Sequence, residues 1–238
     1  MSSDEPPARL ELSGLPGIPE VALSAGLLAR LPQNSAPAPW HCQCSAVVWL
    51  GRGGRAATAA LPSGLTTNSA LMTVGGFVRY TDTPVGPYDE VLGLIGSRSG
   101  ATPWGTVALM AVDSAASLVG GRTNWAMPKT LARFDGEPAA NTTMTARGDD
   151  ALQWEVGARP RVLLGPSIPV KAAGAARQVF SDGRIGESRL RFSGRVRPAL
   201  VNVTVTSAGS LSSWLRPGRH LGAVIDSAAF TLDEPRFR

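Results

Sequence analysis

Short apolar segments rich in β-branched residues, separated by turns that carry glycine or proline, recur at even spacing along most of this chain. The 238 residues include 27 Gly and 19 Pro, spread without a period. Such spacing is typical of a closed or nearly closed antiparallel sheet. We expect strands at residues 44–50, 71–80, 90–95, 106–112, 131–134, 142–147, 151–158, 189–197, 201–206 and 222–232. The predicted fold class is therefore mainly β, an antiparallel barrel with a few peripheral helices.

Two helical segments are expected outside this sheet. Residues 20–31 place apolar side chains at near-helical spacing, and a second helix follows a capping Asp113 or Ser114 and ends at Gly120-Gly121. Hydrophobic residues make up 43% of the chain, which is enough for a full core. We expect a flexible N-terminal arm at residues 1–19 and a single domain at residues 20–238.

Charge and cysteine content argue against several classes of function. The net charge is +5, but the most basic stretch, residues 184–197, alternates like a strand with one charged face. We therefore expect no nucleic-acid partner, and no apolar run reaches membrane-spanning length. Cys42 and Cys44 are too close for an ordinary disulfide, and only His41 and His220 could join them around a metal. Reduced thiols, with an acidic N-terminus unlike a secretory signal, predict a cytoplasmic protein.

Lysine is almost absent from this chain. Of 23 Lys and Arg residues, all but Lys129 and Lys171 are arginine. An amine can lose its proton and attack a carbonyl, whereas a guanidinium cannot. Lys129 follows a proline and lies near Trp125 and Met127, and an apolar setting of this kind favours a neutral amine. Lys129 is therefore a candidate nucleophile, and the plainer interpretation is a solvated lysine after a turn.

Two segments resemble the acetoacetate decarboxylase superfamily. Residues 121–132, GRTNWAMPKTLA, are similar to that family's lysine segment. Residues 80–91, YTDTPVGPYDEV, are similar to its Gly-x-Tyr-x-Glu segment, and Glu90 falls on the family's active-site glutamate. The two segments come in the family's order and at about its separation, so the pair is more specific than either one alone.

The resemblance implies a β-barrel-like fold with helices packed outside, and a homo-oligomer. It also implies a Schiff-base-forming lyase without metal or organic cofactor, in which Lys129 forms an imine and Glu90 is the general acid/base. The substrate would be a ketone or β-keto acid, and the reaction a decarboxylation or a related aldol, retro-aldol or dehydration step. The arginine bias suggests a high-GC bacterium, and family analogy then points to secondary metabolism. Four further residues are expected to contact the substrate: Tyr88, Arg122, Trp125 and Met127.

The sequence departs from the classical decarboxylase at three places. Thr130 stands where that enzyme has a second lysine, Gly75 stands where it has an active-site acid, and the region of its substrate-binding arginine offers His41 instead. A divergent member that acts on a different ketone or aldehyde fits these changes. The alternative function is a non-catalytic small-molecule-binding barrel that has lost the chemistry. The alternative for Glu90 is a solvated carboxylate at the end of a strand.

Overall fold

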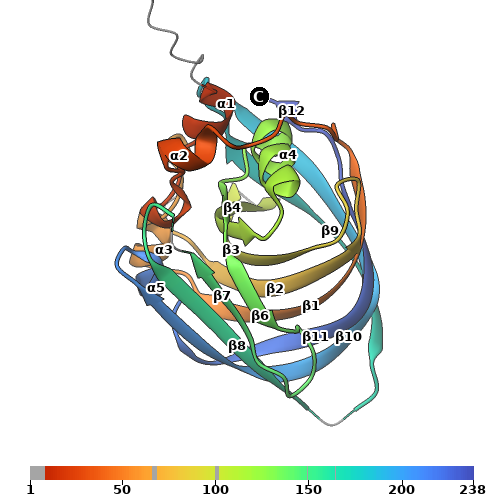
Figure 1. Ribbon diagram of the computed structural model, residues 1–238. Helices are drawn as coiled ribbons and strands as arrows, with labels where there is room; N and C mark the ends of the chain where they lie inside the picture. The colour runs from red at the N-terminus through yellow and green to blue at the C-terminus, as the bar shows by residue number, and fades with distance from the viewer. Residues whose placement is uncertain (1–8, 66–68, 100–101, 149, 164) are drawn as a thin grey trace, which may run out of the picture.

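The computed structural model describes residues 9–65, 69–99, 102–148, 150–163 and 165–238, and strands dominate this part of the chain (Figure 1). The described strands are β1 (Trp40–Arg52), β2 (Met72–Asp82), β3 (Tyr88–Ser99), β4 (Thr102–Val112), β5 (Lys129–Leu131), β6 (Arg133–Gly136), β7 (Met144–Gly148), β8 (Trp154–Val162), β9 (Ile168–Val179), β10 (Ile185–Ser207), β11 (Gly218–Leu232) and β12 (Arg236–Phe237). The helices are α1 (Leu10–Ser13), the 3-10 turn η1 (Pro19–Val21), α2 (Ala25–Leu28), α3 (Arg55–Ala59), α4 (Ala115–Trp125) and α5 (Leu211–Trp214). The prediction of a mainly β fold with a few helices is confirmed.

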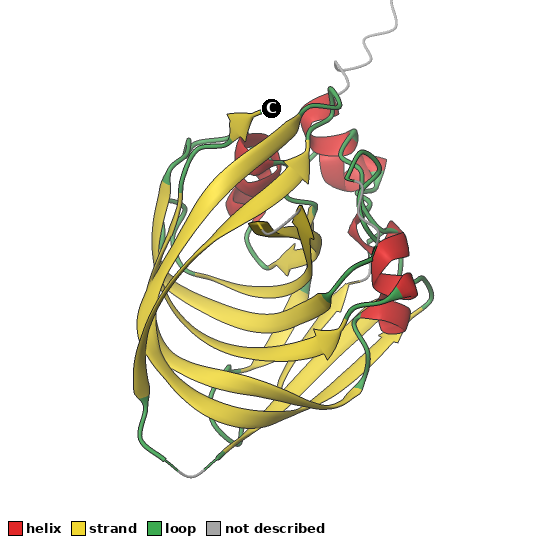
Figure 2. Ribbon diagram, turned by 180° about the vertical axis from the view of Figure 1, so that it is seen from behind, coloured by secondary structure: helices red, strands yellow, loops and turns green. Residues whose placement is uncertain are grey.

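The sheet closes on itself. Its strands pair in the order β11-β1-β2-β3-β4-β9-β10, and β10 also pairs with β11, so these seven strands form a circuit (Figure 2). All neighbours in the circuit are antiparallel except β4 and β9, which are parallel and joined at the single pair Gly105 and Ala176. Strand β10 pairs with β9 along its first half and with β8 along its second half, and β7 and β6 continue the sheet from there.

Alternation of side chains along the strands divides the interior into two cores. On β3, Tyr88 and Leu92 face the space inside the circuit, whereas Val91 and Ile95 face the opposite way. The inner core gathers residues of the circuit strands and α4, and the outer core packs the other face of β1–β4 against β7, β8 and the second half of β10. Strands β1 to β4 therefore have buried side chains on both faces.

Helix α4 packs at one end of the circuit, where its side chains join the inner core (Figure 1). The side chain of Ser114 caps its N-terminus, in agreement with the sequence. The predicted end at Gly120-Gly121 is wrong, because the helix continues past both glycines and ends at Ala126, which has a φ of 53°. Close packing explains the glycines instead: a Cβ on Gly120 would lie 2.5 Å from the Trp40 ring.

The N-terminal segment differs from the expected flexible arm. Residues 1–8 lie outside the described residues, but α1 forms within the expected arm, and its Leu12 is fully buried in the inner core. The helix expected at residues 20–31 is replaced by η1 and α2, with extended backbone at Ala22 and Ser24 between them. The Ser24 hydroxyl begins α2 by accepting a hydrogen bond from the Leu27 N–H.

Several strands differ from the sequence prediction: β12 was not expected, and β5 and β6 replace the single strand expected at residues 131–134. Strand β9 was not expected, because its small and charged residues give no apolar alternation and many of them are exposed. The strands expected at residues 189–197 and 201–206 form one continuous strand, β10, across Pro198. Proline is tolerated there because β10 exchanges partners at that point, from β9 at Val196 to β8 at Ala199.

Candidate active site

A cavity of about 400 Å³ lies inside the circuit of strands. All seven circuit strands contribute to its lining, together with α4 and the segment that follows it. The lining is mostly aliphatic and aromatic. Its polar side chains are Cys42, Cys44, Tyr80, Tyr88, Glu90 and Lys129. Both sequence segments that resemble the decarboxylase family therefore contribute to one cavity.

Lys129 begins β5, which pairs in parallel with β4 and places Lys129 beside Met110. The chain reaches β5 directly from α4, through the left-handed backbone of Ala126 and then Pro128. Only 3% of the Lys129 surface is exposed. The solvated lysine that the sequence also allowed does not occur.

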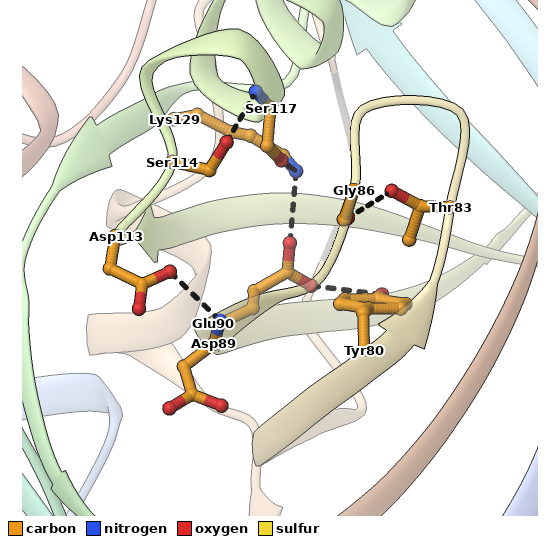
Figure 3. Close-up of polar contacts among 9 residues, drawn as sticks. All are labelled: Tyr80, Thr83, Gly86, Asp89, Glu90, Asp113, Ser114, Ser117 and Lys129. Carbon is orange, nitrogen blue, oxygen red and sulfur yellow. Dashed lines mark hydrogen bonds and ion pairs between the residues drawn. The ribbon is translucent and has the colours of Figure 1, made fainter.

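The Lys129 amine meets the Glu90 carboxylate inside the cavity. Lys129 Nζ donates to Glu90 Oε2 and to Ser117 Oγ, each at 2.9 Å, and Figure 3 shows the amine directed at the carboxylate. Strand β4 lies between β3 and β5, so the two main chains are two strand spacings apart, roughly 10 Å. Two long side chains span that gap, and Glu90 is only 1% exposed, so the ion pair is buried.

Tyr80 and Tyr88 flank this pair. They are cross-strand partners on β2 and β3, and their ring centres lie 4.6 Å apart. The Tyr80 hydroxyl donates to Glu90 Oε1 at 3.3 Å, and Lys129 Nζ lies 5.1 Å from the centre of the Tyr88 ring. Burial, followed by the charge of Glu90, raises the pKa of both phenols well above the usual value. Both hydroxyls therefore keep their protons, and the Tyr80 hydroxyl is a neutral donor to Glu90.

Aromatic and small residues shape the wall around the lysine. Trp125 and Met127 line the cavity, and Trp125 packs edge-on against Trp40, with 5.2 Å between ring centres. Gly121 faces the lysine side chain directly, since a Cβ there would lie 2.6 Å from both Lys129 Cδ and Cε. The glycine thus leaves the space that the lysine side chain occupies.

Arg122 is not among the residues that line the cavity, although the sequence suggested that it contacts the substrate. Its guanidinium is buried and donates to the main-chain carbonyls of Leu12, Val21 and Lys129. Burial lowers its pKa to about 10. Arg122 therefore ties the N-terminal segment and the main chain of Lys129 to α4, which is a structural position.

The two cysteines of β1 face the cavity as neutral thiols. Burial, followed by the charge of Glu90, raises the pKa of Cys42 to about 12 and that of Cys44 to about 11. His41 directly precedes Cys42 and lies on the other face of the strand, exposed and within hydrogen-bond distance of Thr231. Within the described residues, no group of three or more His, Cys, Asp or Glu side chains could hold a metal ion.

Sequence reasoning missed several groups at the amine. Ser117 lies 12 positions before Lys129 on a helix, and no sequence pattern links a lone serine to it. The sequence also missed Trp40, whose ring centre lies 5.9 Å from Lys129 Nζ, because only the fold brings the two residues together. Tyr80 was not missed, since either tyrosine of the chain was expected to be able to orient a substrate oxygen.

The family model for acetoacetate decarboxylase matches residues 33–176, more than half of the chain, and this range includes Glu90 and Lys129. The chain belongs to the acetoacetate decarboxylase family. It is thereby placed among acetoacetate decarboxylase-like lyases. A search of curated proteins finds no match.

Solved structures of acetoacetate decarboxylase-like proteins share the fold. One acetoacetate decarboxylase has a TM-score of 0.65 and 11% identity, over 91% of this chain and 98% of that one. The enduracididine biosynthesis enzyme MppR, complexed with the condensation product of pyruvate and imidazole 4-carboxaldehyde, has a TM-score of 0.61 and 18% identity, over 85% and 90%. Acetoacetate decarboxylase from Legionella pneumophila has a TM-score of 0.59 and 14% identity, over 85% and 88%.

The structure locates the three departures from the classical decarboxylase. Thr130 is buried next to Lys129 in β5, and neighbouring strand residues point to opposite faces, so it is directed away from the amine. Gly75 faces the outer core, where a Cβ would lie 2.2 Å from the Trp49 ring, and His41 is exposed. None of the three lines the cavity. Separately, none of the described helices has the length and apolar character needed to cross a membrane.

Proposed function

We propose that this member of the acetoacetate decarboxylase family is a Schiff-base-forming lyase that acts on a ketone or β-keto acid. Lys129 is the imine-forming nucleophile and Glu90 is the general acid/base. The observation that carries the proposal is the buried contact of 2.9 Å between Lys129 Nζ and Glu90 Oε2 at the wall of an apolar cavity. Both groups border space that a carbonyl compound can enter.

In the first step the Lys129 ammonium group loses its proton. Transfer of one proton from Lys129 to Glu90 gives a neutral amine and a carboxylic acid without changing the net charge of the cavity. Apolar surroundings disfavour separate charges, so they lower the cost of this transfer. The amine then adds to the substrate carbonyl, and Glu90 protonates the carbinolamine oxygen, which leaves as water. The product is a cationic iminium on Lys129 beside the Glu90 carboxylate.

The iminium then accepts the electron pair of the bond that joins the α-carbon, the neighbour of the former carbonyl carbon, to the group that leaves. Loss of carbon dioxide, of an aldehyde, or of an α-proton to Glu90 each gives an enamine. Where an aldehyde leaves, Glu90 takes the proton of its hydroxyl group. Where carbon dioxide leaves, the Glu90 carboxylate first takes up one proton from the solvent. Protonation of the enamine by Glu90 then restores the iminium, and one water molecule hydrolyses it and regenerates the amine. We place Tyr88, Trp125 and Met127 in contact with the substrate on the basis of their positions around Lys129.

A non-catalytic small-molecule-binding barrel is the second candidate. The departures at Thr130 and Gly75 favour it, because the classical decarboxylase has a lysine and an acid there. The buried pair of Lys129 and Glu90 argues for catalysis, since apolar residues of similar size stabilise a protein interior as well as an ion pair does, or better. A barrel that only binds an apolar molecule gains nothing from such a pair.

Trapping of the imine tests the role of Lys129. The protein is incubated with acetone, reduced with borohydride, and its intact mass and peptide map are measured. We expect one adduct, at Lys129, and none in Lys129→Met. Lys171→Met is the matched control, because Lys171 is the only other lysine and lies exposed on β9. Equal labelling of Lys129→Met would remove Lys129 from the mechanism.

Proton exchange tests the role of Glu90. The wild-type protein should exchange the α-protons of acetone for deuterium in heavy water, with exchange followed by NMR. Glu90→Gln should keep the fold and slow this exchange by about 10²-fold or more, the scale of one general acid/base group. Exchange at the wild-type rate in Glu90→Gln would assign the proton transfer to another group.

A further inference from the structure

The polar groups of the cavity are confined to one part of it. On β3, Tyr88 and Glu90 lie beside Lys129, whereas the next two cavity-facing residues, Leu92 and Leu94, are apolar. From Glu90 to Leu94 the strand rises roughly 13 Å. The cavity therefore continues well beyond the reacting atoms, along an apolar wall.

Small residues leave room on the far side of the cavity. The lining there consists of Gly105 on β4 and residues 174–176 on β9, none larger than alanine. Gly174 pairs with Leu190, another lining residue, so the two share the cavity face. A Cβ built on Gly174 would meet no atom within 4 Å, and Gly174 is exposed, so the cavity opens towards solvent at that point.

Among the described residues, Lys129 is the only cation that lines this cavity. Arginines of β10 form ion pairs elsewhere: Arg191 pairs with Asp233, and Arg197 pairs with Asp226. A carboxylate on a substrate would therefore enter an apolar cavity in which the single cation already faces Glu90. Burial of a charge without a partner is strongly unfavourable.

We infer that the substrate of this site is a neutral ketone or aldehyde with a long apolar body, an alkyl chain or aromatic rings, rather than a short keto acid. This inference rests on the imine chemistry proposed for Lys129. The carbonyl lies at the polar part of the cavity, and the apolar body extends past Leu92 and Leu94 towards Gly174. Because such a substrate has no carboxylate to lose, the reaction is an aldol, retro-aldol or dehydration step.

A series of methyl ketones from 2-butanone to 2-octanone tests the inference by borohydride trapping at Lys129. The concentration that gives half-maximal labelling should fall roughly threefold for each added methylene, about 10²-fold across the series. If short ketones label Lys129 and chain length has no effect, the inference fails and the imine chemistry stands. If no ketone labels Lys129, the proposed function fails as well.

A matched pair of ligands tests the preference for a neutral body. In 7-oxooctanoate a carboxylate replaces the terminal methyl group of 2-octanone at the same chain length. We expect half-maximal labelling by 7-oxooctanoate to need at least about tenfold more ligand. Equal or stronger labelling by the carboxylate compound would overturn the inference.

Two variants on β9 test the path of the apolar body. Gly174→Phe places a ring in the open space of the cavity, and Ala173→Phe adds the same ring on the opposite face, beside Lys171. Gly174→Phe should raise the half-maximal concentration of 2-octanone at least about tenfold and leave that of 2-butanone unchanged. Ala173→Phe should change neither. Unchanged 2-octanone labelling in Gly174→Phe, or equal losses for both ketones, would overturn the inferred path.

Discussion

The Gly121→Ala substitution should displace the Lys129 amine while leaving the stability of the fold nearly unchanged. The added Cβ would lie 2.6 Å from Lys129 Cδ and Cε, against an ordinary contact of about 3.6 Å, so the end of the side chain must move by about 1 Å. A flexible lysine yields at low cost, and alanine within a helix is favoured over glycine by about 0.5–1 kcal/mol. The free energy of unfolding should therefore change by less than about 1 kcal/mol, while a 1 Å displacement of a reacting atom slows chemistry about 10²-fold.

The assay measures the rate of imine trapping with acetone and the denaturation curve on the same samples. Gly26→Ala is the control, because a Cβ there meets only Ser24 Oγ, at 4.0 Å, and the change alters only helix propensity. Gly121→Ala with wild-type trapping would refute the claim that this glycine sets the position of the amine. Destabilisation by more than about 3 kcal/mol would refute the claim that the lysine side chain yields at low cost.

Two further predictions concern the buried pair and the thiols. Lys129→Met leaves Glu90 buried without its partner and should lower the free energy of unfolding by about 3 to 5 kcal/mol. The double variant, Lys129→Met with Glu90→Gln, should recover most of this loss. Denaturation curves of the double variant that show no recovery would contradict the prediction. Because the pKa of Cys42 is raised from 9.0 to about 12, its alkylation by iodoacetamide at pH 8 should be at least about 100-fold slower in the folded protein than in urea, as mass spectrometry can measure. Between pH 9.0 and about 12 the folded state keeps the Cys42 proton that the unfolded chain loses. The contribution of this thiol to the free energy of unfolding is therefore complete below pH 9.0 and is lost as the pH rises to about 12.

The sequence predicted the strands with a clear apolar pattern and missed β9, which has none. Strands β1 to β4 are covered on both faces along much of their length, so their middle parts are mostly apolar or β-branched. Strand β9 is largely exposed and contains Lys171 and a run of small residues, which alone resembles a loop. Two separate strands were predicted on either side of Pro198, because the exchange of partners that tolerates this proline within one strand exists only in the folded sheet.

The glycine pair of α4 shows how the same signal has two physical causes. A glycine after an apolar helical pattern predicts a C-cap, yet Gly120 and Gly121 lie inside the helix. The Trp40 ring packs against Gly120, and the Lys129 side chain occupies the space beside Gly121. The cap is Ala126, which no propensity rule would choose for a left-handed backbone. Local rules cannot separate these causes, because the close neighbours come from distant parts of the chain.

Strand pairing links the position of the candidate groups to the fold. Glu90 lies opposite Val112 of β4, and Lys129 lies beside Met110 on the other edge of the same strand. Main-chain hydrogen bonds thus fix the register of both residues, and the carboxylate and amine meet without a loop that could move them apart. The sequence placed Glu90 at the start of a strand and Lys129 two residues before one, but only the order β3-β4-β5 brings them to one point. An ion pair held this rigidly in an apolar cavity adds little to stability that apolar side chains could not supply. Its presence therefore supports the proposed chemistry, in which the amine becomes neutral and a proton moves between the two groups.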